Sequence, residues 1–404
     1  MKAGARAVAA LLTCLVGAGM VGCAHPETKV SKSWDPKTAA AYLDYRASWW
    51  MGWTGSARDH GTFCISCHTA LPFALSRPAL RAALAENGPS ANERKLIENV
   101  TKRVRLWNEV GPYYGDHGYD AKTVESRGTE AVLNALVLAA NDARNGQLSA
   151  DSRAAFDNMW ALQQTMGNSR GSWRWLQFDL EPWEANDSAY YGAALAAMAV
   201  GIAPGNYAST PEIQDKVARL REYLRRESAA QSTMNRVFLL WASAKLPGLL
   251  GREQQEAIIK EVLSKQQADG GWRLASLAWK WNGWTLTSLV NMWLREDGTP
   301  VDGKSDAVAT SLVTLALQET LAPRENDQLK RGISWLTSNQ NAEEGFWPGS
   351  SVNHRQHPAS DTGRFMSDAA TAFAVLALTE NQRTTSAMAS ISEPSKSRPS
   401  ITNH

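Results

Sequence analysis

Four Ala- and Leu-rich stretches recur along the chain, and they constrain its fold more than any other feature. They are TEAVLNALVLAA, DSAYYGAALAAMAV, DAVATSLVTLAL and DAATAFAVLAL, and they begin at Thr129, Asp187, Asp306 and Asp368. The first two stretches start about 60 residues apart, as do the last two, which is a repeat length typical of stacked helical units. The middle gap is about twice as long and contains another apolar stretch, NRVFLLWASAKL. Their apolar residues follow helical spacing with little polarity on any face, which predicts deeply buried helices.

Amphipathic stretches separate these apolar ones. In TPEIQDKVARLREYL, Thr210 is suited to cap a helix and Pro211 to occupy its first turn. Its apolar stripe consists of Ile213, Val217, Leu220 and Leu224. Alternating buried and half-exposed helices at this period predict an all-α fold, either an α/α toroid with inner and outer helices or an α-solenoid.

Short motifs with Gln, Gly and Trp lie between the helices. They are QQTMGNSRGSW, with Gln164, Gly171 and Trp173, KQQADGGW, with Gln266, Gly270 and Trp272, and NQNAEEGFW, with Gln340, Gly345 and Trp347. These motifs resemble the Gln-Trp repeats of the squalene cyclase and prenyltransferase β-subunit superfamily, over roughly residues 121–380. The resemblance implies a toroid in which Gly permits a tight turn, Gln bonds exposed backbone at helix ends and Trp covers the joint.

The sequence CISCH gives the second strong signal. Two further cysteines, Cys14 and Cys23, lie in the N-terminal leader region, so Cys64 and Cys67 are the thiols left for chemistry in the folded body. With His68 they have the spacing by which two thiols bond covalently to haem while the adjacent imidazole ligates the iron. Residues 35–120 are therefore predicted to form a small helical, cytochrome c-like segment that carries one covalent haem c.

Two alternatives to haem remain open. A zinc site would need ligands beyond these three, and a redox dithiol would be expected in a βαβ setting that the surrounding sequence does not resemble. The sixth haem ligand is also open, because the sequence has no Met between Met51 and Met159. His117 is the candidate distal ligand, His60 is a closely tethered second one, and an unligated sixth position is the third possibility.

The N-terminus predicts export. Basic residues at Lys2 and Arg6 precede a short apolar run, so residues 1–22 are interpreted as a signal peptide. The following Cys23 resembles the lipidated cysteine of bacterial lipoproteins, although Met20 departs from the usual Leu and leaves ordinary signal peptidase cleavage open. We expect a linker over residues 23–34 and a periplasmic protein anchored to a membrane, with the outer membrane favoured by Ala24. A disordered tail is expected over residues 381–404, which are rich in Ser and Thr and contain prolines.

The same resemblance raises the question of a catalytic acid. Hopene-type cyclases place an acidic DxDD cluster at the start of an inner helix, and the nearest match here is Glu184 to Asp187, in which Asn186 interrupts the acids. The resemblance implies that Glu184 or Asp187 is a general acid. The structural alternative is that Asp187 is a helix N-cap, like Asp306 and Asp368. Six tryptophans are candidates for the wall of an apolar ligand cavity, or for packing covers between repeats. They are Trp173, Trp175 and Trp183 near this segment, and Trp279, Trp281 and Trp284 in LAWKWNGW.

Two functions from different classes follow. The first is a periplasmic haem protein that transfers electrons to a redox partner or binds a hydrophobic, isoprenoid-like ligand. The second is an enzyme, either a haem-dependent oxidoreductase or a terpene cyclase-like isomerase, acting on a lipid substrate. A net charge of +2 with interspersed acids and bases argues against nucleic-acid binding.

Overall fold

The computed structural model describes residues 33–115, 120–278, 304–321, 326–352 and 356–392. Within these ranges the fold is helical, and the prediction of an all-α protein is confirmed. The exception is a two-stranded antiparallel hairpin of β1 (Ala57–Arg58) and β2 (Thr62–Phe63). The predicted signal peptide, the predicted lipidation site Cys23 and the candidate distal ligand His117 lie outside the described residues.

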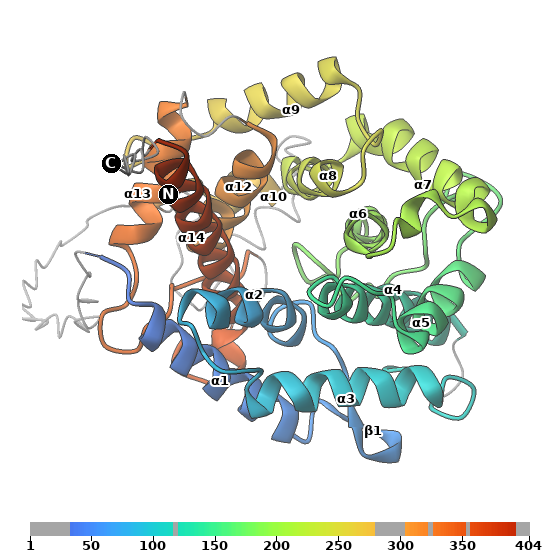
Figure 1. Cartoon of the computed structure of the whole chain (residues 1–404). Helices are drawn as coiled ribbons and strands as arrows, with labels where there is room; N and C mark the ends of the chain where they lie inside the picture. Colours follow the sequence, from blue (N-terminus) through green and yellow to red (C-terminus); the bar gives the residue numbers. More distant parts are fainter. Residues whose placement is uncertain (1–32, 116–119, 279–303, 322–325, 353–355, 393–404) are drawn as a thin grey trace, which may run out of the picture.

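The most buried helices contact one another in chain order. They are α2 (Ala70–Ala83), α4 (Asp120–Asp142), α6 (Ser188–Ile202), α8 (Thr233–Lys245), α12 (Ala307–Thr320) and α14 (Phe365–Ser392). Each packs on the next, and α14 packs on α2, so that the series returns to its beginning (Figure 1). The four repeated apolar stretches thus lie in α4, α6, α12 and α14, and NRVFLLWASAKL lies in α8.

A second set of helices lies outside this series. It comprises α1 (Pro36–Gly52), α3 (Ala91–Arg105), α5 (Ala150–Ala161), α7 (Gln214–Glu227), α9 (Arg252–Ser264) and α13 (Asp327–Ser338). The short helix α10 (Leu274–Ala278) follows α9. As its stripe predicts, α7 buries Val217, Leu220 and Leu224 against α6. In contrast, α6 is buried on every side from Tyr190 to Val200, because its small Ala side chains allow close approach of its neighbours.

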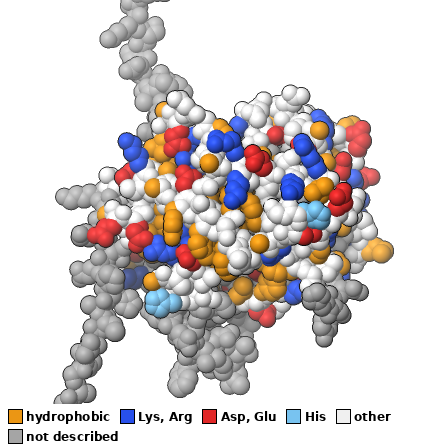
Figure 2. Space-filling model, turned by 90° about the horizontal axis from the view of Figure 1, so that it is seen from below, with side chains coloured by type: hydrophobic (Ala, Val, Ile, Leu, Met, Phe, Trp, Pro, Cys, Tyr) orange, Lys and Arg blue, Asp and Glu red, His pale blue; other side chains and the backbone are white. Residues whose placement is uncertain are grey.

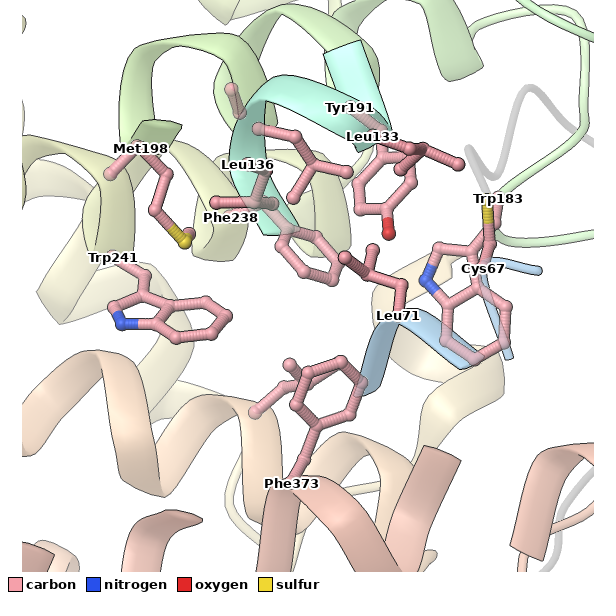
Figure 3. Packing of buried hydrophobic residues seen from close by; sticks show 14 of the residues in the cluster. Cys67, Leu71, Leu133, Leu136, Trp183, Tyr191, Met198, Phe238, Trp241 and Phe373 are labelled. Carbon is pink, nitrogen blue, oxygen red and sulfur yellow. The ribbon is translucent and has the colours of Figure 1, made fainter. Parts of the chain in front are cut away.

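Side chains from the inner helices meet in the middle. Figure 3 shows Leu71, Leu136, Tyr191, Phe238 and Phe373 converging from α2, α4, α6, α8 and α14. All are 1% exposed or less. Burying each of these large side chains contributes about 1.5–3 kcal/mol. They belong to one continuous core that also includes residues of the predicted haem segment, so the core does not divide at residue 120.

The Gln-Trp motifs join successive outer helices. Trp173, Trp272 and Trp347 are fully buried, and each indole N–H donates to a carbonyl in the last turn of the preceding outer helix. In the third joint, Gln340 donates to the carbonyls of Gly345 and Asp35, which caps α1. Gln266 bonds in the same way to Gly270 and Gln328.

The first joint differs from the sequence prediction. There Gln163, and not Gln164, donates to the carbonyls of Gly171 and Lys216. Gln164 instead donates to the hydroxyl of Ser172. The sequence QQ offered both residues, and only the direction of the last turn of α5 decides which one faces the next helix. The loop glycines Gly171, Gly270 and Gly345 have positive φ, as the tight turn requires.

Three further details concern the ends of helices. Helix α14 continues to Ser392, so residues 381–392, which were expected in the disordered tail, are helical. This is consistent with the absence of Pro between Pro358 and Pro394. Asp306 caps α12 as predicted, accepting from two backbone N–H groups. Asp368 is not a cap, because it lies inside α14 and bonds side chains of other helices.

The surface shows charges of both signs. On the face in Figure 2, Lys and Arg side chains alternate with Asp and Glu side chains and with scattered hydrophobic ones. The charges on this face therefore do not add up to a field of one sign. Among the described residues, none of the helices combines the length and the apolar character that crossing a membrane requires.

Candidate functional site

The CISCH segment connects β2 to α2 and lies where the inner helices begin. The hydroxyl of Ser66, inside the motif, accepts from the backbone N–H groups of Thr69 and Ala70 at 3.2 and 3.0 Å. These bonds satisfy donors at the start of α2, which would otherwise lack partners. Cys67 and His68 are thereby fixed beside the first turn of the helix.

Side chains of the outer helices hold the backbone just before this turn. The indole N–H of Trp50 in α1 donates to the carbonyl of Cys64 at 2.9 Å. The side-chain amide of Asn99 in α3 both accepts from the N–H of Phe63 and donates to its carbonyl, at 2.8 and 3.0 Å. Arg103, also in α3, donates to the hydroxyl of Thr62 at 2.7 Å. The motif therefore sits in a preformed setting and not in a free loop.

The two thiols are buried and unpaired. Cys64 is 3% exposed and Cys67 2% exposed, and no disulfide joins them. Burial raises the pKa of Cys64 to about 11 and that of Cys67 well above its ordinary value. Reactive redox thiols have lowered pKa values in exposed, electropositive surroundings, so these two lack the properties of a redox dithiol. A thioether, in contrast, is uncharged and suits an apolar site.

The imidazole of His68 is held on several sides. Its ring stacks on Phe365 with the centroids 3.8 Å apart and meets Trp50 edge-on at 5.1 Å. Its Nδ1 lies 2.8 Å from the hydroxyl oxygen of Thr69. Burial lowers the pKa of His68 to about 3, so the ring is neutral at physiological pH. A neutral imidazole with one nitrogen engaged can offer the other, Nε2, to a metal.

A cavity of about 120 Å³ opens beside Cys67 and His68. Its walls come from the start of α2, from the loop before α6 and from the loop before α14. They include Cys67, His68, Trp183, Glu184, Ser350, Gln356, Phe365 and Met366. Figure 3 shows Trp183 next to Cys67 at the edge of the central core. The cavity thus lies at the end of the molecule where inner helices start.

The structure separates the two acids that sequence could not distinguish. Glu184 lines the cavity, and burial raises the pKa of its carboxyl to about 7, with Lys122 opposing the shift. Asp187 does not line the cavity and occupies the N-cap position of α6 without a side-chain bond to the helix end. Glu184 therefore has the position and the pKa of a general acid or base, whereas Asp187 does not line the cavity.

The donor set fits a covalent haem. Cys64 and Cys67 would supply the two thioethers and His68 the axial nitrogen, in surroundings that favour uncharged sulfur and neutral imidazole. The cavity itself is smaller than the roughly 300–1,000 Å³ of typical cofactor pockets. A porphyrin would therefore have to displace part of its wall, which includes Phe365 and Met366 in the first turn of α14.

Other predicted residues lie elsewhere or are not described. His60 is exposed, adopts a left-handed backbone conformation and does not line the cavity. Of the tryptophans proposed to wall a cavity, Trp183 lines it, whereas Trp173 and Trp175 are fully buried packing residues. Trp279, Trp281 and Trp284 lie outside the described residues.

Sequence reasoning missed Thr69, Phe365, Met366 and Asp368 as parts of the site. The last three lie about 300 residues from the motif and reach it only through the packing of α14 on α2. The available signal in the sequence was position, because Met366 stands two residues before the repeated stretch that begins at Asp368.

The chain matches no protein-family model and no curated protein. Among the described residues, no group of three or more His, Cys, Asp or Glu side chains converges as the ligands of a bare metal ion would.

Proposed function

We propose that this protein is an exported, lipid-anchored c-type haem protein of the periplasm, with haem attached through Cys64 and Cys67 and ligated by His68. The observation that carries the proposal is the state of His68. Its Nδ1 is engaged by Thr69, its pKa is lowered, and it lines a cavity together with Cys67. When bound, the haem would supply one-electron transfer to a redox partner.

The haem site would be carried by a toroid of the squalene cyclase type. Support comes from the closed order of inner-helix contacts and from the Gln and Trp bonds that repeat in three joints. In this arrangement residues 35–120 contribute α2 to the inner layer and α1 and α3 to the outer layer, so the haem segment is built into the ring. Trp183, Phe365 and Met366 give the cavity an apolar wall suited to a hydrophobic ligand.

The test is the absorption spectrum and intact mass of the chain expressed with a c-type haem maturation system. We expect a haem spectrum and a mass increase of one haem that survives denaturation. Cys64→Ser and Cys67→Ser each remove one thioether, and the double variant should lose the covalent haem entirely. Cys23→Ser is the matched control, since it removes only the predicted lipid anchor and should keep the haem. Colourless wild-type protein with the mass of polypeptide plus lipid would refute the proposal.

A second candidate, an enzyme acting on a terpenoid or lipid, is favoured by one observation. Glu184 presents a carboxyl with a pKa of about 7 to the same cavity, which is a suitable value for proton transfer near neutral pH. Incubation with squalene should then yield a product that Glu184→Gln abolishes and Asp187→Asn leaves unchanged. Equal product from both variants would remove Glu184 as the acid.

A further inference from the structure

Thr69 occupies the N-cap position of α2 but does not cap the helix. Its side chain makes no bond to the helix end, and the hydroxyl of Ser66 performs that role instead. Thr69 is 3% exposed, and its hydroxyl oxygen lies 2.8 Å from Nδ1 of His68. The same hydroxyl donates to Oδ2 of Asp368 in α14 at 2.7 Å. The hydroxyl is therefore committed to a link between His68 and Asp368.

Asp368 is itself held by α1. Arg46 donates to Oδ1 through Nε at 2.7 Å and to Oδ2 through Nη2 at 3.1 Å, and the hydroxyl of Tyr42 donates to Oδ1 at 2.9 Å. Arg46 is 1% exposed and Asp368 2%. A guanidinium does not lose its proton in proteins, so a carboxylate in this bidentate contact is the negative partner of an ion pair.

The hydrogens of this network can be counted. A threonine hydroxyl has a single hydrogen, and here it points to the Asp368 carboxylate. Toward His68 the same oxygen can only accept, so the hydrogen in the 2.8 Å contact belongs to Nδ1 of the imidazole. A neutral imidazole that is protonated at Nδ1 carries its lone pair on Nε2. Phe365 covers a face of the ring, and His68 lines the cavity next to Cys67.

We propose that Arg46, Asp368 and Thr69 are positioning residues that fix His68 as the Nδ1–H tautomer with Nε2 available to the iron. The role of His68 as an iron ligand rests on the proposed haem function, whereas the hydrogen-bond network itself does not depend on it. Partners of this kind orient an imidazole ligand and increase the electron density that it donates to a metal. Here Arg46 comes from α1 and Asp368 from α14, near the two ends of the described chain. The packing of α14 on α2 therefore also orients the imidazole of His68.

The direct test uses nitrogen-15 NMR of His68 in the full chain produced without haem maturation. The wild-type ring should show a protonated Nδ1 and an unprotonated Nε2. Thr69→Val keeps the shape and removes the hydroxyl, and it should convert the ring to a mixture of tautomers. Thr69→Ser restores a hydroxyl and should restore the single tautomer. An unchanged tautomer in Thr69→Val would overturn the inference.

A second readout uses the haem-loaded protein. Loss of the bond to Nδ1–H makes the imidazole a poorer donor to ferric iron, so Thr69→Val should raise the reduction potential relative to wild type and Thr69→Ser. Equal potentials in the three proteins would also overturn the inference.

The two proposals can fail separately. If the wild-type chain never acquires haem but the tautomer still depends on the Thr69 hydroxyl, the positioning network stands and the haem function fails. If haem is attached and neither tautomer nor potential responds, the haem function stands and the network does not position His68.

Discussion

Two buried ion pairs flank the CISCH segment, and they differ in what lies beyond them. Arg103 in α3 pairs with Glu130 in α4 at 2.5 Å and bonds Thr62, before the motif. Arg46 in α1 pairs with Asp368 in α14 at 2.7 Å, and Asp368 bonds Thr69, after the motif. Each pair thus holds one threonine at an end of the same short segment.

The difference lies in the third partner. Arg103 is 0% exposed and also donates to the Thr62 hydroxyl, to the carbonyl of Gly111 and to the carboxylate of Asp59. The Arg46 pair continues through Thr69 to the ring of His68. Two arrangements with the same chemistry therefore differ in their contacts: the first holds the chain before the motif, and the second also reaches the imidazole of His68 through Thr69.

The largest expected effect tests the first pair. Glu130→Gln leaves Arg103 charged and buried, with Asp59 at 3.5 Å as its remaining acidic partner, and should lower the free energy of unfolding by about 3–5 kcal/mol. Asp368→Asn should cost less, because Arg46 keeps Asp361 at 2.8 Å, and Asp361 is 47% exposed and well hydrated. Denaturant unfolding of the two variants measures both losses of unfolding free energy. Equal or reversed losses would mean that the two pairs are not distinguished by their remaining partners.

The next effect concerns Glu184, a buried carboxyl that forms an ion pair with neither Arg103 nor Arg46. Glu184 has a pKa raised by burial to about 7 from 4.5, so the folded state holds its proton more tightly than the unfolded state. Stability due to this group therefore falls as the pH rises from about 4.5 to about 7 and stays lower above that. Glu184→Gln removes the penalty and should stabilise the protein by about 1–3 kcal/mol at pH 8, after allowing for partial exposure, and by almost nothing at pH 4.

Unfolding curves of wild type and Glu184→Gln at the two pH values provide the measurement. Glu130→Gln is the contrasting variant, because Glu130 is paired and its loss should be destabilising at both pH values. A gain from Glu184→Gln that is the same at pH 4 and pH 8 would show that packing, and not ionisation, is responsible.

The smallest effect compares the two threonines. Thr62→Val and Thr69→Val each remove one hydroxyl bonded to a buried charged group, and each should cost about 1–3 kcal/mol in unfolding free energy. Their consequences for the site should differ, since Thr69→Val changes the His68 tautomer and Thr62→Val does not. The same NMR experiment on both variants decides this, and a tautomer change in Thr62→Val would erase the distinction between the pairs.

Much of the helical plan follows from local pattern. The apolar stretches became α4, α6, α12 and α14 because their composition leaves no polar face to turn toward water, and the stripe of α7 became its buried side. The Gln-Trp spacing likewise located three joints, since Gly at positive φ and a Trp able to donate to the preceding helix are local requirements. The prediction that Gln164 forms the first joint was wrong, because Gln163 bonds the carbonyl of Lys216 in the facing helix α7. Local sequence does not specify which of the two residues faces that helix.

The sequence by itself determined the proposed donor set, because the thiol and imidazole spacing in Cys64, Cys67 and His68 is a property of five consecutive residues. Only the tertiary structure decided how those donors are held. It placed Glu184 and not Asp187 on the cavity, and it brought Asp368 and Phe365 to a histidine about 300 residues away. The physical reason is that burial and hydrogen bonding set tautomer and pKa, and both arise from contacts between helices that local sequence does not specify.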